Sequence, residues 1–572
     1  MGNPIYLPPW AEELRLRYIS GEASLFLLHG NVRDLYPWTA EDGQLSYMDL
    51  QGFLLRFLGR AKDFVLYYNI SDGVQIDSKA KRILLLNKLN VRRQINGREP
   101  IDSFPETPGE LLPFVEEIIT DSAGNSAVVM DYIETIAPSG DLGFMTDEQK
   151  RDLVRLQRWT SNSELLGSDN LVIMVTENLA DVPRRLLGCA QLAVIEVTRP
   201  TSKSRRNYVS QADLSDVDFG EGMDGQRFAD VCAGLSLVQI RGLLKRSRMT
   251  EESVTFKTVN LRKKSIIEQE CHGLVEFVAP EHDFSHVGGM SALKSELMRV
   301  AGAIKAGRAN QVPMGMLFVG PMGTGKTFIA EAFAGESGLT CIKFKNFREK
   351  WVGSTEGNLE KILQVVRSLG YVLLIIDEAD RSMSGGDRDG GTSSRVIARI
   401  KEFMSNTAHR GRILVLMMTN RPDKIDVDLK RPGRLDYKVP FFFPQDEETR
   451  KAILGALVRK NRISLAEGVD TDVIGGPTEG YSAAELEAVL LRGMRLASED
   501  DREELSEDDL LAAAADVIPS RDARMLEFME MLAVFESSSQ EMLPEKYRNL
   551  PTGEVLERLD LLRGQLQMER RA

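Results

Sequence analysis

The chain has 572 residues, enough for about three or four domains, and a formal net charge of −13. This acidic composition disfavours nucleic-acid binding, which usually needs a basic surface. The four scattered cysteines contain no CxxC pair and the five histidines no HExxH motif, so neither a zinc site nor a disulfide framework is indicated.

The first residues carry no charged segment followed by an apolar stretch, and no apolar run approaches the roughly 18 residues that cross a bilayer. The sequence therefore predicts a cytoplasmic protein without a membrane segment.

Short apolar segments in the second half of the chain predict the strands of a sheet. They are residues 316–319, 340–344, 371–376 and 413–418, and amphipathic helical patterns separate them. Strands alternating with such helices are typical of an α/β fold with a parallel sheet covered on both faces. From about residue 447 to 517 the pattern is wholly helical and predicts a separate small bundle.

The first half repeats this order in weaker form. Apolar segments at residues 24–28, 64–70, 127–130, 171–175 and 192–197 predict five strands, and a helical stretch follows from about 226 to 247. Asp131 falls where Asp377 falls in the second half, and Thr176 falls where Thr419 falls. We interpret this as a degenerate copy of the same module, although any open α/β domain could produce similar spacing.

Two further segments complete the organisation. Residues 250–280 predict a helix and a linker. Near the C-terminus, the 4-3-4 spacing of Val555, Leu559, Leu562 and Leu566 predicts a helix that packs on its own body, because it is too short for a stable coiled coil. The predicted domains are 1–249, 250–283, 284–446, 447–518 and 519–572.

A glycine-rich loop follows the strand at residues 316–319. It matches the pattern G-x-x-x-x-G-K-T of a P-loop, in which backbone N–H groups surround phosphates, the lysine binds the β- and γ-phosphates and the threonine hydroxyl ligates Mg²⁺. The predicted ATP-binding residues are Gly320, Pro321, Met322, Gly323, Thr324, Gly325, Lys326 and Thr327.

Two carboxylates end the strand at residues 371–376. Asp377 is placed to hold Mg²⁺, and Glu378 is placed to polarise the attacking water, which favours hydrolysis over simple binding. Asn420 ends the strand expected beside it, where an uncharged amide can orient the water. Arg431 and Arg434 lie on a Pro-Gly turn and are predicted to reach the site of a neighbouring subunit, although an ordinary surface ion pair is the alternative.

These residues closely resemble the AAA clade of P-loop ATPases over about residues 284–517. Residues 284–289 are similar to its adenine-contacting entry motif, which adds Val287 and Gly288 to the ATP-binding set. Residues 480–485 resemble its lid motif, which adds Gly480 and Ala484. Met322 stands where the family usually has proline. Within the clade, residues 263–277 and 391–396 are most similar to the AAA proteins of hypothetical chloroplast open reading frame forty-six and their bacterial relatives.

The resemblance also implies how such a protein works. AAA proteins form hexameric rings, use ATP and Mg²⁺, and place an aromatic residue on a central pore loop. Lys350, Trp351 and Val352 match that loop, with a tryptophan in the core as the alternative. Residues 384–394 resemble the second pore loop.

The chemistry of the first half is predicted to be lost. No Gly-Lys-Thr follows its first strand, Tyr132 stands in place of the catalytic glutamate, and Glu177 stands in place of the sensing asparagine. We therefore expect no hydrolysis and no ATP binding in this half, which would serve ring assembly or substrate recruitment.

The leading hypothesis is a homo-oligomeric ring that hydrolyses ATP to remodel protein substrates through its pore. The alternative is an ATP-switched scaffold that threads nothing. A nucleic-acid motor is disfavoured by the acidic charge. The sequence does not identify the protein substrate.

Overall fold

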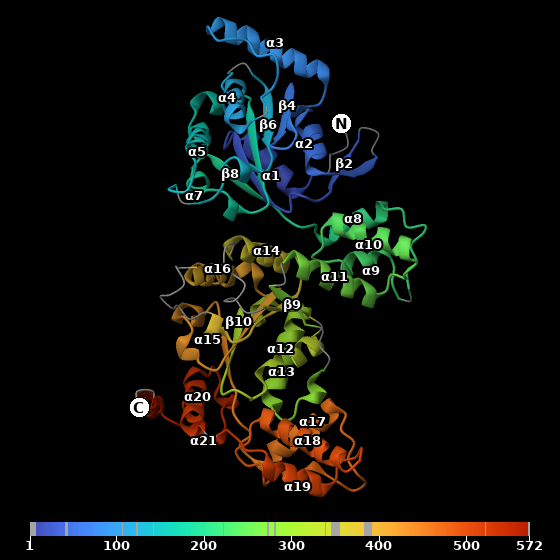
Figure 1. Ribbon diagram of the computed structural model, residues 1–572, viewed down its shortest axis with the longest axis vertical. Coiled ribbons are helices and arrows are strands. Elements are labelled where there is room, and N and C mark those ends of the chain that lie inside the picture. The colour runs from blue at the N-terminus through green and yellow to red at the C-terminus, as the bar shows by residue number, and fades with distance from the viewer. Residues whose placement is uncertain are drawn as a thin grey trace. The chain divides into compact units, whose positions relative to one another are not determined.

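The structure is a computed structural model of the chain (Figure 1). It describes residues 7–40, 44–105, 107–121, 124–140, 142–220, 222–271, 274–278, 282–337, 339–344, 355–382, 392–520 and 522–569. Contacts divide the chain into two compact units. One comprises residues 1–265 with 356–368, and the other comprises residues 266–355 with 369–572.

The first unit begins with an α/β sheet domain. Its strands are β1 (Leu25–Gly30), β2 (Tyr36–Thr39), β3 (Leu45–Met48), β4 (Phe64–Asn69), β5 (Gly73–Ile76), β6 (Ser126–Met130), β7 (Leu171–Thr176) and β8 (Leu192–Val197). Its helices are α1 (Pro9–Ile19), α2 (Leu50–Leu58), α3 (Lys79–Ile95), α4 (Pro108–Ile119), α5 (Asp147–Thr160), α6 (Ser163–Leu166) and α7 (Arg184–Leu187). All five predicted strands are confirmed, within two residues at each end.

Six of these strands form one sheet in the order β5-β4-β6-β7-β1-β8, in which only β5 is antiparallel. Successive residues of a strand point to opposite faces, so they enter two separate cores. Leu25 and Leu27 pack with α4 and α5, whereas Phe26 and Leu28 pack with α1 and α2. Figure 1 shows these two pairs of helices on opposite sides of the sheet.

A helical segment follows the sheet. It contains α8 (Ser202–Gln211), α9 (Gly225–Val231), α10 (Leu237–Thr250) and α11 (Phe256–Glu270). The predicted helical stretch over residues 226–247 is confirmed, but as two helices, because the chain breaks between α9 and α10. Gly234 has a φ of 90°, and Ser236 starts a new helix with a reciprocal capping box to Gln239.

Two buried cations lie beside the C-terminal end of α9. The Arg205 guanidinium donates to the Ala229 carbonyl at 2.8 Å, and the Lys263 ammonium donates to the Val231 carbonyl at 3.2 Å. Carbonyls at a helix C-terminus carry partial negative charge and attract cations. Burial nevertheless lowers the pKa of Lys263 to about 8.

Replacing Lys263 by methionine is expected to stabilise the first unit. In the native protein the pKa is about 8, below the ordinary value of 10.5. Between pH 8 and 10.5 Lys263 is protonated in the unfolded chain and neutral in the folded one, so the free energy of unfolding rises with pH. Below pH 8 Lys263 is charged in both states, and the full cost of burying that charge remains. Lys263→Met should therefore raise the free energy of unfolding at pH 7 by about 1–2 kcal/mol. Urea unfolding at pH 7 to 10.5 measures both effects.

The exposed Lys257 on the same helix supplies the control, because Lys257→Met removes a charge without changing burial. A Lys263→Met variant that is less stable than the Lys257→Met variant at pH 7 would contradict this account.

The second unit contains the second sheet. Its strands are β9 (Val275–Phe277), β10 (Gly315–Val319), β11 (Thr340–Phe344), β12 (Val372–Ile376), β13 (Ile413–Thr419) and β14 (Tyr437–Pro440). Helices α12 (Ser291–Lys305), α13 (Lys326–Ser337), α15 (Ala379–Ser382) and α16 (Thr392–Ser405) follow these strands in the chain, and α14 (Thr355–Ser368) groups with the first unit. The four predicted strands are confirmed, whereas β14 and β9, the latter in the segment expected to be a helix and a linker, were not predicted.

The two sheets have the same architecture. The second has the order β14-β10-β13-β12-β11-β9, with only β9 antiparallel. When the strands are matched by their place in this order, β1 corresponds to β10, β4 to β11, β6 to β12, β7 to β13 and β8 to β14. Each sheet also ends in an antiparallel strand beside β4 or β11. The repeated order agrees with a degenerate copy of the module in the first half, which stays a prediction.

A small helical bundle follows the second sheet. It contains α17 (Glu447–Asn461), α18 (Ala483–Glu499) and α19 (Glu507–Asp516), as predicted, around a core that includes Leu454, Leu486 and Leu510.

The C-terminal segment is also helical, with α20 (Ala523–Glu536), α21 (Glu545–Arg548) and α22 (Thr552–Glu569). Val555, Leu559 and Leu562 of α22 are buried with α20, which confirms that this helix packs on its own body. The buried Glu536 carboxylate pairs with Lys430 and, at 2.9 Å, with Lys438, and so anchors α20 to the sheet domain. Among the described helices, none is both long and apolar enough to cross a membrane.

Candidate nucleotide site

The glycine-rich loop lies between β10 and α13, as its motif requires. Gly320 has a φ of 155°, and a Cβ atom there would lie 2.2 Å from the Phe441 carbonyl oxygen. Only glycine fits this position, because any side chain would collide with the backbone after β14. The loop residues Met322 to Thr327 line a pocket of about 700 Å³.

Lys326 is the buried cation of this loop. Its ammonium donates to the Gly320 carbonyl at 2.9 Å and to the Pro321 carbonyl at 2.6 Å. Burial lowers the pKa of Lys326 to about 8, although the nearby Asp377 and Asp380 carboxylates oppose that shift. The described contacts give this ammonium no ion pair, and a bound phosphate would supply a counterion.

Thr327 and Asp377 meet in the same pocket. The Thr327 hydroxyl donates to Asp377 Oδ2 at 3.1 Å. Asp377 directly follows β12, which lies two strands from β10 in the sheet. These are hard oxygen ligands of the kind that Mg²⁺ prefers. No group of three or more His, Cys, Asp or Glu side chains suited to a metal occurs among the described residues. This donor set fits Mg²⁺, which is usually held by one or two carboxylates together with substrate phosphates.

Glu378 follows Asp377 in a strained conformation. Its φ is 46°, and its N–H donates to Asp377 Oδ1 at 2.9 Å. A non-glycine residue in the left-handed region costs about 1 kcal/mol or more and is often found at functional sites. This turn exposes the Glu378 side chain to the pocket, where a carboxylate can act as a general base.

Asn420 lines the same pocket from the end of β13. The preceding Thr419 is fixed, since its hydroxyl donates to Asp380 at 2.8 Å and accepts the Arg421 N–H at 2.9 Å. The P-loop, the two carboxylates and this amide therefore converge from three strands, as the sequence predicts.

The helical bundle forms the opposite wall of the pocket. Ala484, at the start of α18, donates its N–H to the Gly323 carbonyl at 3.2 Å. Gly288 does not line the pocket, but it packs so tightly on α17 that a Cβ atom would lie 2.3 Å from the Ile453 Cα. The Val287 carbonyl accepts a hydrogen bond from Lys294, and Gly480 has a φ of 80° just before α18. Val287, Gly288 and Gly480 are thus structural neighbours of the site.

The two arginines of the Pro-Gly turn differ in their surroundings. The Arg431 side chain is 69% exposed, and its guanidinium pairs with the Asp428 carboxylate at 3.1 Å. Arg434 donates to Ser405 Oγ at 2.8 Å and to the Asp428 carbonyl at 2.7 Å. Neither lines the pocket of its own unit. Arg431 is therefore better placed than Arg434 to reach another molecule.

Several pocket residues were missed from the sequence. They come from the bundle, from strands β9 and β11 and from the first turn of α13, and they are Glu276, Phe328, Lys343, Phe344, Leu457, Lys460, Ala483 and Glu487. Lys460 lies over the Phe328 ring at 4.7 Å and pairs with Glu487 at 2.9 Å. Their spacing in the sequence carries no motif, because the fold alone brings them together. Lys350, Trp351 and Val352 lie outside the described residues, as do residues 384–391 of the second predicted pore loop.

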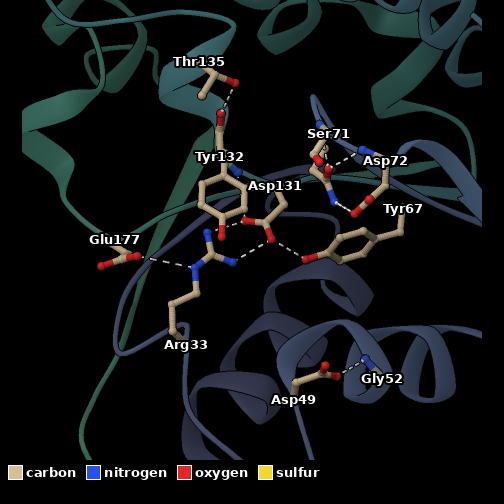
Figure 2. A network of polar contacts seen from close by, with 11 residues as sticks. Arg33, Asp49, Gly52, Tyr67, Ser71, Asp72, Asp131, Tyr132, Thr135 and Glu177 are labelled. Atoms are coloured by element: carbon tan, nitrogen blue, oxygen red, sulfur yellow. Dashed lines mark hydrogen bonds and ion pairs between the residues drawn. The ribbon is translucent and has the colours of Figure 1, made fainter. Parts of the chain in front are cut away.

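The equivalent edge of the first sheet holds a closed ionic network (Figure 2). Arg33 donates to both oxygens of Asp131, at 2.6 and 2.8 Å, and the Tyr67 hydroxyl donates to Asp131 Oδ2 at 2.5 Å. The guanidinium lies 3.9 Å from the centre of the Tyr132 ring and 3.5 Å from a Glu177 oxygen. Burial would lower the pKa of Arg33, but the hydrogen bonds and charge of Asp131 raise it above its ordinary value.

In this network the Asp131 carboxylate is not available to bind a metal ion. Its Oδ1 also accepts the Tyr132 N–H at 2.8 Å, so each oxygen already has two donors. The side chain is 4% exposed and its charge is matched internally by Arg33. The residues therefore do not fit Mg²⁺.

The sheet order, the P-loop and the paired carboxylates define a P-loop nucleotide-binding domain preceded by a copy without a P-loop. Comparisons with known proteins agree with this description. Residues 316–443 match the family model of the ATPase family associated with various cellular activities (AAA). Residues 4–198 match the AAA+ chaperone N-terminal Rossmann-like domain, and residues 203–272 match the AAA+ chaperone second helical domain.

A curated relative supports the same assignment. The chain is 27% identical over 416 residues to the cell division cycle protein 48 homolog of Archaeoglobus fulgidus. The match covers 67% of this chain and 56% of that relative, so the chain corresponds to little more than half of the relative's length. The chain therefore carries AAA+ chaperone-type N-terminal and second helical domains, followed by an AAA domain at residues 316–443. The finer similarity to the chloroplast open reading frame forty-six group stays a prediction.

Proposed function

We propose that this protein hydrolyses ATP in the pocket described above and uses the energy to remodel, unfold or disassemble protein substrates. The observation that carries this proposal is the convergence of Lys326, Thr327, Asp377, Glu378 and Asn420 on one pocket of about 700 Å³. Each of these groups has a distinct role in phosphoryl transfer to water.

The roles follow from charge and position. Lys326 binds the β- and γ-phosphates of ATP, and Thr327 and Asp377 hold Mg²⁺, which neutralises charge on the phosphates when bound. Glu378 accepts a proton from the attacking water, and Asn420 orients that water. Leu457 and Ala484 offer an apolar surface for the base. The family resemblance adds Val287 and Gly288 of the entry motif to this part of the site.

The site is proposed to be completed by a second subunit. Arg431 and Arg434 come from outside the pocket of their own unit, and an arginine supplied by a neighbour stabilises the charge that develops on the transferred phosphoryl group. This arrangement requires a homo-oligomer, and the family resemblance suggests a ring of six subunits. A pore loop with Lys350, Trp351 and Val352 would then grip the polypeptide substrate.

A substrate trap tests the proposal. The Glu378→Gln variant, purified from its native cells with ATP, should retain specific proteins that mass spectrometry identifies. The same trap carrying Trp351→Ala should lose them if substrates are held in the pore.

Trp351→Ala alone should reduce remodelling of a captured substrate by at least tenfold while ATP hydrolysis stays within about twofold of the unaltered protein, since removing an aromatic hot spot weakens grip without touching the pocket. Partners that remain bound regardless of Trp351 would instead favour an ATP-switched scaffold that threads nothing.

A further inference from the structure

Lys343 places a second cation beside the metal-binding carboxylate. It is the only charged residue of β11, and its ammonium lies 3.0 Å from Asp377 Oδ2. Both side chains are 26% exposed, and both line the pocket. The contact is therefore partly shielded from solvent and open to a ligand.

The two oxygens of Asp377 have different partners. Oδ1 accepts the Glu378 N–H at 2.9 Å, which fixes the orientation of the carboxylate. Oδ2 accepts the Thr327 hydroxyl at 3.1 Å and also contacts the Lys343 ammonium. The oxygen that faces Thr327, the other predicted metal ligand, is thus the one that Lys343 holds.

The first sheet has a donor at the same position. Phe344 is in register with Ile376, and Tyr68 is in register with Met130, so Lys343 and Tyr67 occupy equivalent places one residue earlier. Tyr67 donates to Asp131 Oδ2, as Lys343 contacts Asp377 Oδ2. In the first sheet Arg33 also binds the aspartate and the arrangement is closed, whereas in the second Lys343 is the one side-chain cation that the described contacts place on the aspartate.

We propose that Lys343 is a positioning residue that competes with Mg²⁺ for Asp377 and so sets the Mg²⁺ concentration at which the site binds nucleotide. This inference rests on the proposed function of the same pocket. A lysine ammonium and a divalent cation repel each other when they share one carboxylate oxygen. The lysine side chain has a long flexible stem, so the ammonium can leave the carboxylate without a change in the backbone.

The competing explanation is that Lys343 binds phosphate directly. Lysine is a common phosphate ligand, and Lys343 lines the pocket. The two roles predict opposite effects, because a competitor of Mg²⁺ weakens metal-dependent binding whereas a phosphate ligand strengthens binding with or without the metal.

The test uses the full chain and the fluorescent nucleotide N-methylanthraniloyl-ADP. Binding is titrated at Mg²⁺ concentrations from micromolar to millimolar for the unaltered protein, Lys343→Met and the control Lys451→Met, which removes a surface lysine paired with Glu447. Lys343→Met should lower the Mg²⁺ concentration for half-maximal binding by about tenfold, equivalent to about 1.4 kcal/mol. The control should leave it unchanged.

Two further measurements separate the explanations. In an Asp377→Asn background, adding Lys343→Met should leave nucleotide affinity unchanged, because the lysine acts through Asp377. In EDTA without nucleotide, Lys343→Met should unfold at a lower temperature than Lys451→Met, because Asp377 has lost its counterion.

An unaltered Mg²⁺ dependence in Lys343→Met would overturn the inference, as would weaker nucleotide binding in the Asp377→Asn background. If the unaltered protein binds no nucleotide at any Mg²⁺ concentration, the proposed function itself fails and this inference falls with it. The result for the unaltered protein therefore distinguishes the two failures.

Discussion

Substitution of Glu378 by glutamine is expected to reduce the rate of ATP hydrolysis by roughly 1,000-fold, within the range that a general base contributes. Glutamine keeps the shape of the side chain but cannot accept the proton of the attacking water. ATP binding should persist, because Lys326 and Thr327 are unchanged. Phosphate release measures hydrolysis, and the rise in melting temperature with added ATP measures binding.

The first sheet supplies a control at the matching position. Tyr132 also follows the equivalent aspartate with a left-handed backbone, its φ being 54°, and Tyr132→Phe should leave hydrolysis unchanged. A Glu378→Gln protein that hydrolyses ATP at more than about a tenth of the normal rate would contradict the role given to Glu378.

Replacement of Arg33 by methionine is expected to destabilise the first unit by about 3–5 kcal/mol. Asp131 would keep its buried negative charge and lose the only cation that the described contacts place against it. Breaking a buried ion pair from one side costs much more than replacing both partners. Urea unfolding followed by tryptophan fluorescence measures the change, since the buried Trp10, Trp38 and Trp159 all lie in this unit.

A second substitution tests the reason for the loss. The double variant Arg33→Met with Asp131→Asn should recover more than half of the lost stability, because an amide at this position carries no charge. The surface pair of Arg15 and Glu12, about 40% exposed, provides the control, and Arg15→Met should cost less than about 1 kcal/mol. If Arg33→Met and Arg15→Met lower the free energy of unfolding equally, Arg33 and Asp131 do not behave as a buried ion pair.

The nucleotide pocket was predictable from the sequence because its motifs are local. The loop, the paired carboxylates and Asn420 each follow an apolar strand, and parallel strands bring their carboxyl ends to one edge of the sheet. The repeated order of apolar segments likewise predicted the first sheet, although the P-loop motif is not repeated there.

The ionic contacts could not be predicted, because they depend on how strands pair. Arg33 and Asp131 are 98 residues apart, and β7 lies between the two strands that precede them, β1 and β6. In the sequence Lys343 is simply the one charged residue of a short strand. Only the register between β11 and β12 brings its ammonium to Asp377. The three-residue β9 was missed because it forms a strand only by pairing with β11 at the edge of the sheet. A signal did exist for the break before α10, since the Ser236 and Gln239 spacing marks a helix start.

The left-handed turn shared by Tyr132 and Glu378 has a consequence for how such chains are recognised. In both halves the residue after the aspartate bends the same way, and its N–H returns to that aspartate. In the first half the same left-handed turn places Tyr132, which has no carboxylate, so the turn itself does not depend on a general base at this position. Backbone dihedral angles can therefore be alike where the letters of a motif differ. Surveys of backbone geometry at strand ends should find domains with this turn that motif searches pass over.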